Sequence, residues 1–284
     1  MAEIGKLGVV GAGQMGAGIA QVAATAGVKV TLVDVDAASL KKGRASIEKS
    51  LGKLVEKEKV SAADRDAALE RIDEATEVEA LAGSDFVVEA ISENEALKKK
   101  VWTGIEEVVS GDAILASNTS SISITRLAAA LQKPERFIGM HFMNPVPLMK
   151  LVEIIPGLQT SPATLEATDA FAARLGKTTV RSDDQPGFIV NRILMPMINE
   201  AFVALQEGLG TPEDIDAGMK LGTNQPMGPL TLADFIGLDT CLAIMNVLHE
   251  GLGDSKYRPA PLLRRYVDAG WLGRKTKRGI YTYE

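Results

Sequence analysis

The chain has 284 residues, of which 46% are hydrophobic and 24% charged, as is ordinary for a globular protein long enough to bury a substantial core. Its net charge of −6 gives no bulk attraction to nucleic acid or to an anionic membrane, so neither kind of partner is expected. The single cysteine, Cys241, excludes an internal disulfide, and two histidines leave little material for a transition-metal site, so no metal is expected.

No apolar run reaches the roughly 20 residues that a membrane span needs. Residues 1–6 lack the charged and then apolar layout of a signal peptide, and they do not read as an Arg- and Ser-rich transit peptide. We therefore expect a cytoplasmic protein, or a mature form from which a targeting segment was removed.

The N-terminal part of the chain predicts a strand, a glycine-rich turn, a helix and a second strand. Residues 4–10 form a short apolar run, and residues 11–16 read Gly-Ala-Gly-Gln-Met-Gly. Residues 17–26 are good helix formers, and residues 28–33 form a second apolar run that ends at Asp34. This is the G-x-G-x-x-G arrangement in which strand, turn, helix and a following acid bind a dinucleotide.

Each glycine of this turn has a physical task. Gly11 permits the tight turn, Gly13 lets a pyrophosphate approach the backbone, and Gly16 lets the helix pack closely on the strand. The N-terminus of the helix offers free N–H groups and partial positive charge to the phosphates. We therefore expect this turn, with Gln14 and Met15, to lie against the cofactor.

Asp34 decides between the possible dinucleotides. Its carboxylate can accept hydrogen bonds from the ribose hydroxyls of the adenosine, and it would repel a 2′-phosphate. NAD is therefore expected rather than NADP, and FAD stays open as an alternative.

The next segment departs from a minimal strand–helix–strand unit. Residues 36–59 form a long polar stretch with a helical pattern, and Ser61 is expected to cap a second helix that runs to about Asp73. The two helices are expected to form a hairpin that projects from the sheet.

One face of the first of these helices is basic. Ser46, Lys49, Ser50, Lys53 and Lys57 recur at helical spacings, so they share a face. A basic, hydroxylated stripe suits a phosphorylated ligand. Glutamates are interleaved nearby, however, and the pattern alone favours a solvated face.

Two further strands carry polar groups at their ends. Residues 84–91 read as a buried parallel strand, and Glu93 and Lys98 follow at its carboxyl end, where doubly wound sheets bind ligands. Residues 113–116 form the next strand and lead into Ser-Asn-Thr-Ser-Ser-Ile-Ser at 117–123. These hydroxyls and amides can cap a helix that runs to Leu131, and they can also bind a reacting oxygen.

A hairpin is predicted about Pro147. The apolar arms on both sides place His141 and Glu153 at equal distances from this bend, so an antiparallel register sets them opposite each other. A carboxylate in this position can orient an imidazole and stabilise the imidazolium. Taken alone, the stretch is equally compatible with a surface hairpin whose His and Glu are merely solvated.

The chain then reads as a helix at 161–175 and a last strand at 177–181. Residues 183–187 carry turn chemistry and no apolar side chain, so we place a domain boundary there, between a domain of residues 1–184 and one of residues 185–284.

The second domain reads as all-helical. Residues 188–208 are apolar nearly all round, so this helix is expected to be buried on several sides, and Asn191 is a polar exception near its start. Thr211 is expected to cap the next helix, and two or three more complete the domain. A domain with this many apolar residues is expected to bury some of them against a partner subunit. The basic tail at 273–283, taken alone, reads as a solvated C-terminus.

Together these stretches resemble the L-3-hydroxyacyl-CoA dehydrogenase family over nearly the whole chain. The most specific pieces are the glycine turn at 9–16, Ala-Ser-Asn-Thr-Ser-Ser at 116–121, the hairpin at 141–153, Pro-Gly-Phe-Ile-Val-Asn-Arg at 186–192 and Gln-Pro-Met-Gly-Pro at 225–229. The resemblance implies an α/β fold, with a Rossmann-type doubly wound NAD-binding sheet that carries the helical hairpin insertion, plus a C-terminal all-α domain for substrate binding and dimerisation.

The resemblance also implies roles for single residues. His141 would be the general base and Glu153 the carboxylate that orients it, while Ser120 and Asn191 would contact the substrate oxygen and the catalytic histidine. The positions implied to lie on the cofactor side are Gly11, Gly13, Gln14, Met15, Gly16, Asp34, Glu93, Lys98, Asn118, Ser120, Asn144 and Lys275.

Ser50, Lys53 and Lys57 match the helix that members of the family use against the nucleotide of coenzyme A. The resemblance therefore favours an acyl-CoA ligand for the basic stripe. The tail departs from the family's Lys-Thr-Gly pattern, since Lys277 and Arg278 add charge there, and this puts the cofactor contact of the tail in doubt.

The activity implied is reversible NAD-dependent hydride transfer between a (3S)-3-hydroxyacyl-CoA, of short chain such as 3-hydroxybutyryl-CoA, and the 3-oxoacyl-CoA, such as acetoacetyl-CoA. A homodimer through the C-terminal domain is expected. Two alternatives stay open: a dehydrogenase of a free hydroxy or sugar acid, and a non-enzymatic, crystallin-like protein on the same fold.

Overall fold

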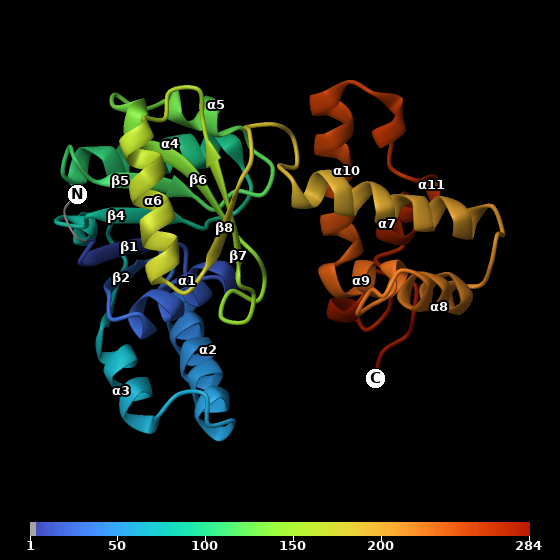
Figure 1. Cartoon of the computed structure of the whole chain (residues 1–284), viewed down its shortest axis with the longest axis horizontal. Helices are drawn as coiled ribbons and strands as arrows, with labels where there is room; N and C mark the ends of the chain where they lie inside the picture. The colour runs from blue at the N-terminus through green and yellow to red at the C-terminus, as the bar shows by residue number, and fades with distance from the viewer. Residues whose placement is uncertain (1–3) are drawn as a thin grey trace. The chain divides into compact units, whose positions relative to one another are not determined.

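The computed structural model of the chain describes residues 4–284; residues 1–3, which belong to the segment compared with a signal peptide, lie outside them. The chain divides into two compact units, Met1–Gln185 and Pro186–Glu284. Figure 1 shows strands and helices in the first unit and helices in the second. Each unit has a hydrophobic core of its own.

The first unit is built on an eight-stranded sheet in the order β3-β2-β1-β4-β5-β6-β7-β8. Neighbouring strands from β3 to β6 pair in parallel, β7 is antiparallel to β6, and β8 is parallel to β7. The order reverses at β1, as the expected doubly wound sheet requires, and such sheets bind ligands beside this point. The strands are β1 (Lys6–Val10), β2 (Lys29–Val33), β3 (Ile72–Ala75), β4 (Phe86–Glu89), β5 (Ile114–Ser117), β6 (Phe137–Phe142), β7 (Leu151–Pro156) and β8 (Thr178–Arg181).

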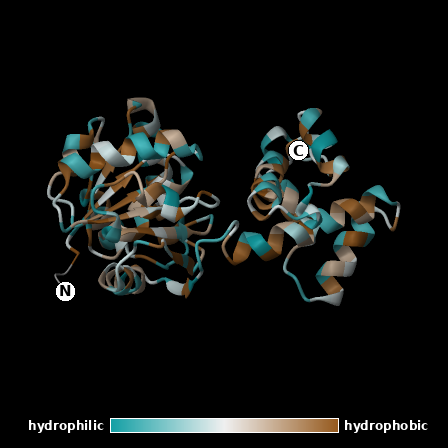
Figure 2. Ribbon diagram, turned by 90° about the horizontal axis from the view of Figure 1, so that it is seen from above, coloured by the Kyte–Doolittle hydropathy of each residue, from teal (hydrophilic) through white to brown (hydrophobic). Residues whose placement is uncertain are grey.

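Helices cover both faces of this sheet. On one face, α1 (Gln14–Thr25) and α6 (Pro162–Arg174) share a core with alternate strand residues, and the rings of Phe86 and Phe171 lie 4.8 Å apart. Successive strand residues point to opposite faces, so the intervening residues face the other side. Figure 2 shows the strands mainly in brown, between helices that carry teal.

The opposite face is covered by α4 (Glu95–Val108). The indole of Trp102 meets the ring of Phe137 edge to face, with centroids 5.0 Å apart. Ile138, the next residue of β6, belongs to the core on the α1 side. The sheet is thus buried on both faces, and only its edges and strand ends can receive a ligand.

The helical insertion forms as expected between β2 and β3. Asp36 caps α2 (Ala37–Glu56), and Ser61 caps α3 (Ala62–Glu70) by accepting a hydrogen bond from the N–H of Asp64. Both helices pack against α1. Figure 1 shows their far ends extending beyond the sheet.

The prediction that the second inserted helix runs to Asp73 was wrong. The helix ends at Glu70, and Asp73 belongs to the edge strand β3, which pairs with β2. Ile72 is the one residue of this strand with a buried side chain, so its pattern gave no strand signal.

The helix expected to reach Leu131 is also shorter than predicted. α5 comprises Ile124–Ala128, and Leu131 lies in a following turn in which its N–H donates to the carbonyl of Ala128. Pro134 follows closely, and a proline biases the residue before it away from helix, so the chain turns here to enter β6.

The second unit packs around α7 (Val190–Gln206). This helix begins later than expected, because Phe188 has a φ of +50° and lies in the left-handed region. Within the single chain it is not buried on all sides: Met195 and Phe202 are buried, whereas Ile193 is 68% exposed. The helices that complete the unit are α8 (Pro212–Gly222), capped by Thr211 as predicted, α9 (Pro229–Ile236), α10 (Leu238–Leu252) and α11 (Pro261–Asp268).

The expectation of a solvated C-terminal tail holds for its basic part, residues 274–278, which are exposed, but was wrong for residues 279–283. Asp234 of α9 is buried and accepts hydrogen bonds from the N–H groups of Ile280 and Tyr281 and from the hydroxyl of Tyr283, each at 2.8–2.9 Å. Asp216 accepts a further bond from the Tyr281 hydroxyl at 2.9 Å. These two acids lie far from the tail in sequence, so the local pattern could not reveal them.

Among residues 4–284 no single helix is both long and apolar enough to cross a membrane. The pair α9 and α10 meets the length and composition required only when taken together, and it is bent by 99°.

Candidate functional site

The glycine-rich turn after β1 has the geometry that a phosphate site needs. Gly11 has a φ of +101°, and a Cβ on Gly16 would stand 1.7 Å from the carbonyl oxygen of Gly11, so both positions require glycine. At Gly13, by contrast, no described atom lies within 4 Å of where a Cβ would stand. The first turn of α1 therefore presents its N–H groups to open space, as a bound pyrophosphate would require.

A cavity of about 640 Å³ opens beside this turn, at the ends of β1, β2 and β4. Asp34 lies in its wall and accepts hydrogen bonds from the N–H groups of Ala12 and Asp36 at 2.8 and 3.0 Å. Its carboxylate is therefore held in place beside the turn. The residues that line the cavity fit the adenosine end of a dinucleotide, and they include Val10, Gly11, Gly13, Val33, Asp34, Val35, Ala90, Ile91 and Ser92.

His141 and Glu153 face each other as predicted. They are directly paired in the β6–β7 ladder, and Nδ1 of His141 lies 2.8 Å from Oε2 of Glu153. Both side chains are buried. A carboxylate at Nδ1 keeps the proton on that nitrogen, so Nε2 is the nitrogen that can take a proton from another group.

The tip of this hairpin packs against α1, the helix that follows the glycine-rich turn and is here called the cofactor helix. The side-chain amide of Gln14 donates to Oδ1 of Asn144 at 2.9 Å. A Cβ on Gly18 would stand 2.8 Å from Val146, so the tip lies directly on α1. Lys177 donates to the carbonyls of Val146 and Met149 and closes the tip from the other side. Asn144 is thereby placed beside the glycine turn.

Asn118 follows β5 directly and is bonded to the ends of the strands on either side of it, β4 and β6. Its Oδ1 accepts a hydrogen bond from the N–H of Phe142 at 2.9 Å, and its own N–H donates to the carbonyl of Glu89 at 2.8 Å. It therefore ties the loop after β5 to the end of β6, where His141 lies.

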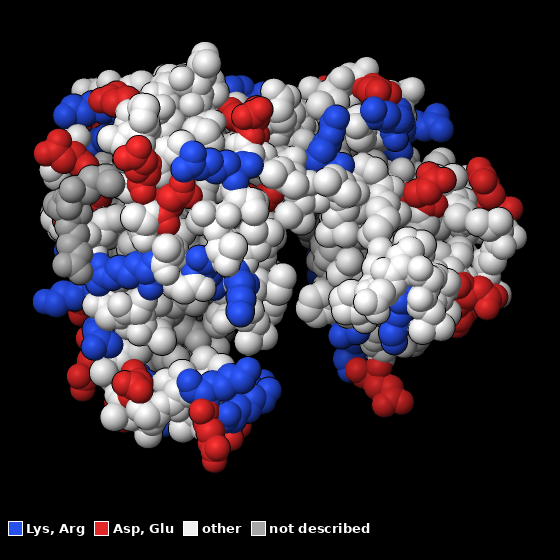
Figure 3. Space-filling view, viewed as in Figure 1, with Lys and Arg blue, Asp and Glu red and all other residues white. Residues whose placement is uncertain are grey.

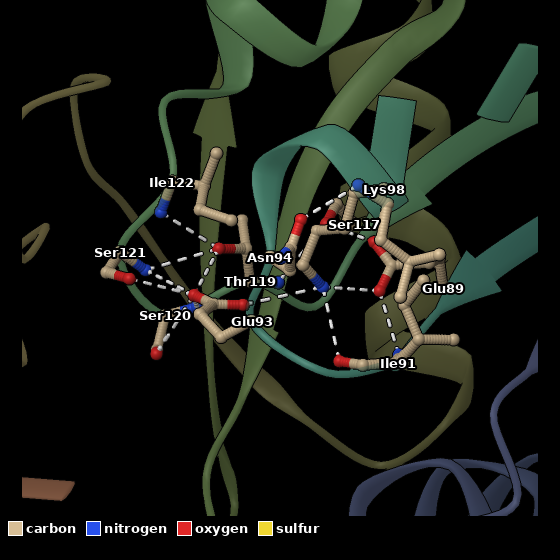
Figure 4. A network of polar contacts seen from close by, with 11 residues as sticks. Glu89, Ile91, Glu93, Asn94, Lys98, Ser117, Thr119, Ser120, Ser121 and Ile122 are labelled. Carbon is tan, nitrogen blue, oxygen red and sulfur yellow. Dashed lines mark hydrogen bonds and ion pairs between the residues drawn. The ribbon is translucent and has the colours of Figure 1, made fainter. Parts of the chain in front are cut away.

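One carboxylate oxygen of Glu93 is hydrogen-bonded to the serine-rich loop at the end of β5, residues Ser117–Ser121. Its Oε1 accepts hydrogen bonds from the hydroxyl of Thr119 at 2.6 Å, from the N–H of Ser120 at 3.0 Å and from the hydroxyl of Ser121 at 2.9 Å (Figure 4). Burial by itself raises the pKa of the Glu93 carboxyl, but the ammonium of Lys98 and these hydrogen bonds together hold that pKa below its usual value. Glu93 is therefore held as the anion.

Lys98 lies behind this loop and is 1% exposed. Its ammonium pairs with Glu89 and lies 3.4 Å from Oε2 of Glu93. The sequence predicted Lys98 and Glu93 as site residues but not Glu89, because an acid at the end of an apolar strand was interpreted as a polar residue flanking that strand. Its only signal was a carboxylate inside a run predicted to be buried on both faces.

The basic stripe lines a groove of about 390 Å³ on α2. Figure 3 shows blue gathered at the lower end of the first unit, over the end of this helix. Sequence reasoning missed its other wall, which comes from the tip of the β6–β7 hairpin. The residues that line the groove are Ser46, Lys49, Ser50, Lys53, Leu54, Lys57, Lys59, Pro145, Pro147 and Leu148.

The two candidates from the C-terminal part of the chain lie in the second unit. Asn191 is in the first turn of α7 and is buried. The ammonium of Lys275 pairs with Asp239 at 2.6 Å and is partly exposed. Within residues 4–284 no group of three or more His, Cys, Asp or Glu side chains could hold a metal ion.

Comparison with known families matches both units. Residues 6–185 match the family described as "3-hydroxyacyl-CoA dehydrogenase, NAD binding domain", and residues 187–283 match "3-hydroxyacyl-CoA dehydrogenase, C-terminal domain".

Similar proteins match along nearly their whole length. A 3-hydroxybutyryl-CoA dehydrogenase of Bradyrhizobium diazoefficiens is 60% identical, over 99% of this chain and 96% of that protein. A probable 3-hydroxybutyryl-CoA dehydrogenase of Bacillus subtilis is 53% identical, over 99% of this chain and 98% of that protein. The crystal structure of an (S)-3-hydroxybutyryl-CoA dehydrogenase from Ralstonia eutropha is 54% identical, covers 99% of this chain and 100% of its own, and superposes with a TM-score of 0.96.

Proposed function

Because the chain belongs to the 3-hydroxyacyl-CoA dehydrogenase family over both of its units, we propose that it interconverts (3S)-3-hydroxybutyryl-CoA and acetoacetyl-CoA. It is an NAD-dependent oxidoreductase of this family. The observation that carries the proposed chemistry is the buried His141–Glu153 pair, at 2.8 Å.

In the direction of oxidation, His141 accepts the proton of the substrate hydroxyl at Nε2. Glu153 keeps the Nδ1 proton in place and stabilises the imidazolium as it forms, a contribution that for positioned acid–base groups is about 10² to 10⁴-fold. When bound, NAD supplies the acceptor of the hydride from C3. In the direction of reduction, the imidazolium returns its proton to the oxygen.

Ser120 and Asn191 are proposed to position the substrate oxygen. Ser120 lies in the loop held by Glu93, and its hydroxyl is 3.3 Å from Oε1 of that carboxylate. A polar group fixed in advance stabilises charge that develops on an oxygen without reorganising during the reaction. The assignment of Asn191 rests on its sequence motif and on its buried place in α7.

The cofactor is proposed to lie along the glycine turn, with its adenosine ribose at Asp34 and its nicotinamide end towards Glu93 and Asn144. The turn has room for a pyrophosphate at Gly13, and Asp34 is held beside it. Gln14, Met15, Lys98, Asn118 and Lys275 are proposed as further cofactor-side residues, either by contact or by holding those that make contact.

The groove on α2 is proposed to hold the nucleotide of coenzyme A. Lys53, Lys57 and Ser50 supply two ammonium groups and a hydroxyl along one wall, and Pro147 and Leu148 supply apolar surface along the other. Such a combination suits a phosphorylated ligand that also carries an adenine ring. A free hydroxy acid would leave this groove without an occupant.

A homodimer through the second unit is also proposed. A largely apolar groove of about 460 Å³ there is lined by Met197, Ala201, Leu209 and Met219, and Leu209 is 80% exposed. Exposed apolar patches of this kind are typical of subunit interfaces. A cytoplasmic location is proposed as well, and there the buried thiol of Cys241, whose pKa burial raises to about 12, would stay protonated and reduced.

The test is the oxidation of NADH with acetoacetyl-CoA, followed by absorbance. His141→Gln keeps a donor for Glu153 but cannot pass a proton, so it is expected to lose activity while its melting temperature stays close to that of the wild type. His249→Ala, at the other histidine, is the matched control and is expected to stay active. An inactive wild type would contradict the proposed activity, and a fully active His141→Gln would contradict the role of His141 as the general base. Free acetoacetate as substrate separates a thioester enzyme from a dehydrogenase of free acids.

A further inference from the structure

Glu89 is a fully buried carboxylate at the end of β4, and it contacts three different segments. Its Oε1 pairs with the ammonium of Lys98 in α4 and accepts a hydrogen bond from the N–H of Ile91 at 2.8 Å. Its Oε2 accepts a bond from the hydroxyl of Ser117 at the end of β5, also at 2.8 Å. Glu89 is therefore the shared anchor of two strand ends and a helix (Figure 4).

Two routes lead from Glu89 to the serine-rich loop. Through Lys98 it reaches Glu93, whose Oε2 lies 3.4 Å from the ammonium. Through Ser117 it reaches Thr119, because the N–H of Thr119 donates to the Ser117 hydroxyl at 3.3 Å. Both routes end at the loop in which Ser120 lies.

The network also reaches the wall of the dinucleotide cavity. Ile91, whose N–H donates to Glu89 and whose carbonyl accepts from Lys98 at 3.3 Å, lines that cavity together with Ala90 and Ser92. One buried ion pair thus sets the positions of a cavity wall and of the loop that carries Ser120.

An ion pair that is buried to this extent contributes little net stability to a fold. Removing two charges from water is unfavourable, and an apolar pair of similar size is often equally stable or more so. The Glu89 and Lys98 side chains are 0% and 1% exposed, so this penalty applies in full. What the charges provide, and an apolar pair cannot, is a set of directed bonds to Ser117, Ile91 and Glu93.

We propose that Glu89 is a positioning residue for hydride transfer: acting through Lys98 and Ser117, it fixes Glu93 and the Ser117–Ser121 loop in the arrangement that receives the substrate oxygen and the cofactor. This inference rests on the proposed function, and it adds a residue that touches neither ligand.

One variant replaces the pair by Glu89→Leu with Lys98→Met. The double variant is expected to fold, since no charge is left buried without a partner, although the N–H of Ile91 and the hydroxyl of Ser117 lose their acceptor. Amide hydrogen exchange of residues 117–122 is expected to become faster, and kcat with acetoacetyl-CoA is expected to fall about 10²-fold, the effect of a misplaced reacting group. If the ion pair served only to stabilise the fold, the folded double variant would have the kcat of the wild type.

The single variant Glu89→Gln keeps the shape of the side chain and removes its charge, and it keeps Lys98, which is itself proposed as a cofactor-side residue. The same two measurements on Glu89→Gln therefore assign the effect to Glu89. Glu106→Gln is the matched control: Glu106 is also in α4 and forms a buried ion pair, with Arg136 at 3.3 Å, at the other end of the helix. It is expected to lower the melting temperature but to leave both the exchange of residues 117–122 and kcat unchanged.

Faster exchange at 117–122 together with slow turnover, in a folded variant, supports the proposal. Wild-type exchange at these amides, or wild-type turnover, overturns it. The exchange experiment needs no substrate, so it decides on Glu89 even if the wild type fails to turn over acetoacetyl-CoA, a result that would count against the proposed function instead.

Discussion

Glu153 and His141 are joined across paired strands, with Oε2 of the carboxylate 2.8 Å from Nδ1 of the imidazole and both side chains buried. The contact fixes the ring tautomer and faces the imidazolium with a negative charge. In a buried setting such a charge is felt strongly, because little water screens it.

Glu153→Gln tests that charge. The amide oxygen can still accept the Nδ1 hydrogen bond, and no unpaired charge is left, so the variant should fold. Without the carboxylate the imidazolium is less stable. We therefore expect kcat with acetoacetyl-CoA to fall about 10²-fold or more. The measurement is kcat at saturating acetoacetyl-CoA, with NADH affinity as the control that should not move. A kcat equal to that of the wild type would count against the role of Glu153.

Charge reversal in the basic groove tests the site for coenzyme A. Lys53→Glu with Lys57→Glu should raise the KM for acetoacetyl-CoA about tenfold or more and leave the KM for NADH unchanged. The difference should shrink as salt is added, because salt screens exposed charges. Lys41→Glu, on the same helix but outside the groove, should behave as the wild type. If the double variant and Lys41→Glu changed the KM values for acetoacetyl-CoA and NADH to the same extent, the basic stripe would be a solvated face and not a binding site.

Two glycines of the turn separate folding from cofactor binding. A Cβ on Gly13 meets no described atom within 4 Å, so Gly13→Ala should keep the wild-type melting temperature and weaken NADH binding about tenfold or more. A Cβ on Gly16 would stand 1.7 Å from the Gly11 carbonyl oxygen, so Gly16→Ala should lower the melting temperature as well. Thermal unfolding and NADH titration measure the two effects.

Gly52→Ala, inside the C-terminal half of α2 and with no described atom within 4 Å of its Cβ, is the control for these substitutions. It should stabilise the protein by about 0.5–1 kcal/mol, because alanine loses less backbone entropy than glycine in a helix. Wild-type NADH affinity in Gly13→Ala would show that the turn does not hold the cofactor.

Local patterns were sufficient wherever neighbours in sequence decide the structure. The glycine turn, the caps at Ser61 and Thr211 and the pairing of His141 with Glu153 were all predicted correctly. The family resemblance, the Rossmann-type fold and NAD as cofactor were confirmed as well.

Tertiary contacts decided the rest. The edge strand β3 has one buried side chain, so its pattern could not be told from a helix end. The tail is held by Asp234, more than forty positions earlier, as its bond to the N–H of Ile280 shows. Glu89 is an anchor only because the sheet sets the ends of β4 and β5 side by side.

The tip of the β6–β7 hairpin contacts both the basic groove and the first residue of α1. Its prolines line the basic groove, while Asn144 in the same tip is bonded to Gln14 at the start of the cofactor helix. A ligand that shifts the tip must therefore change the affinity for the ligand on its other side, and thermodynamic linkage makes that change reciprocal, by the same factor in both directions.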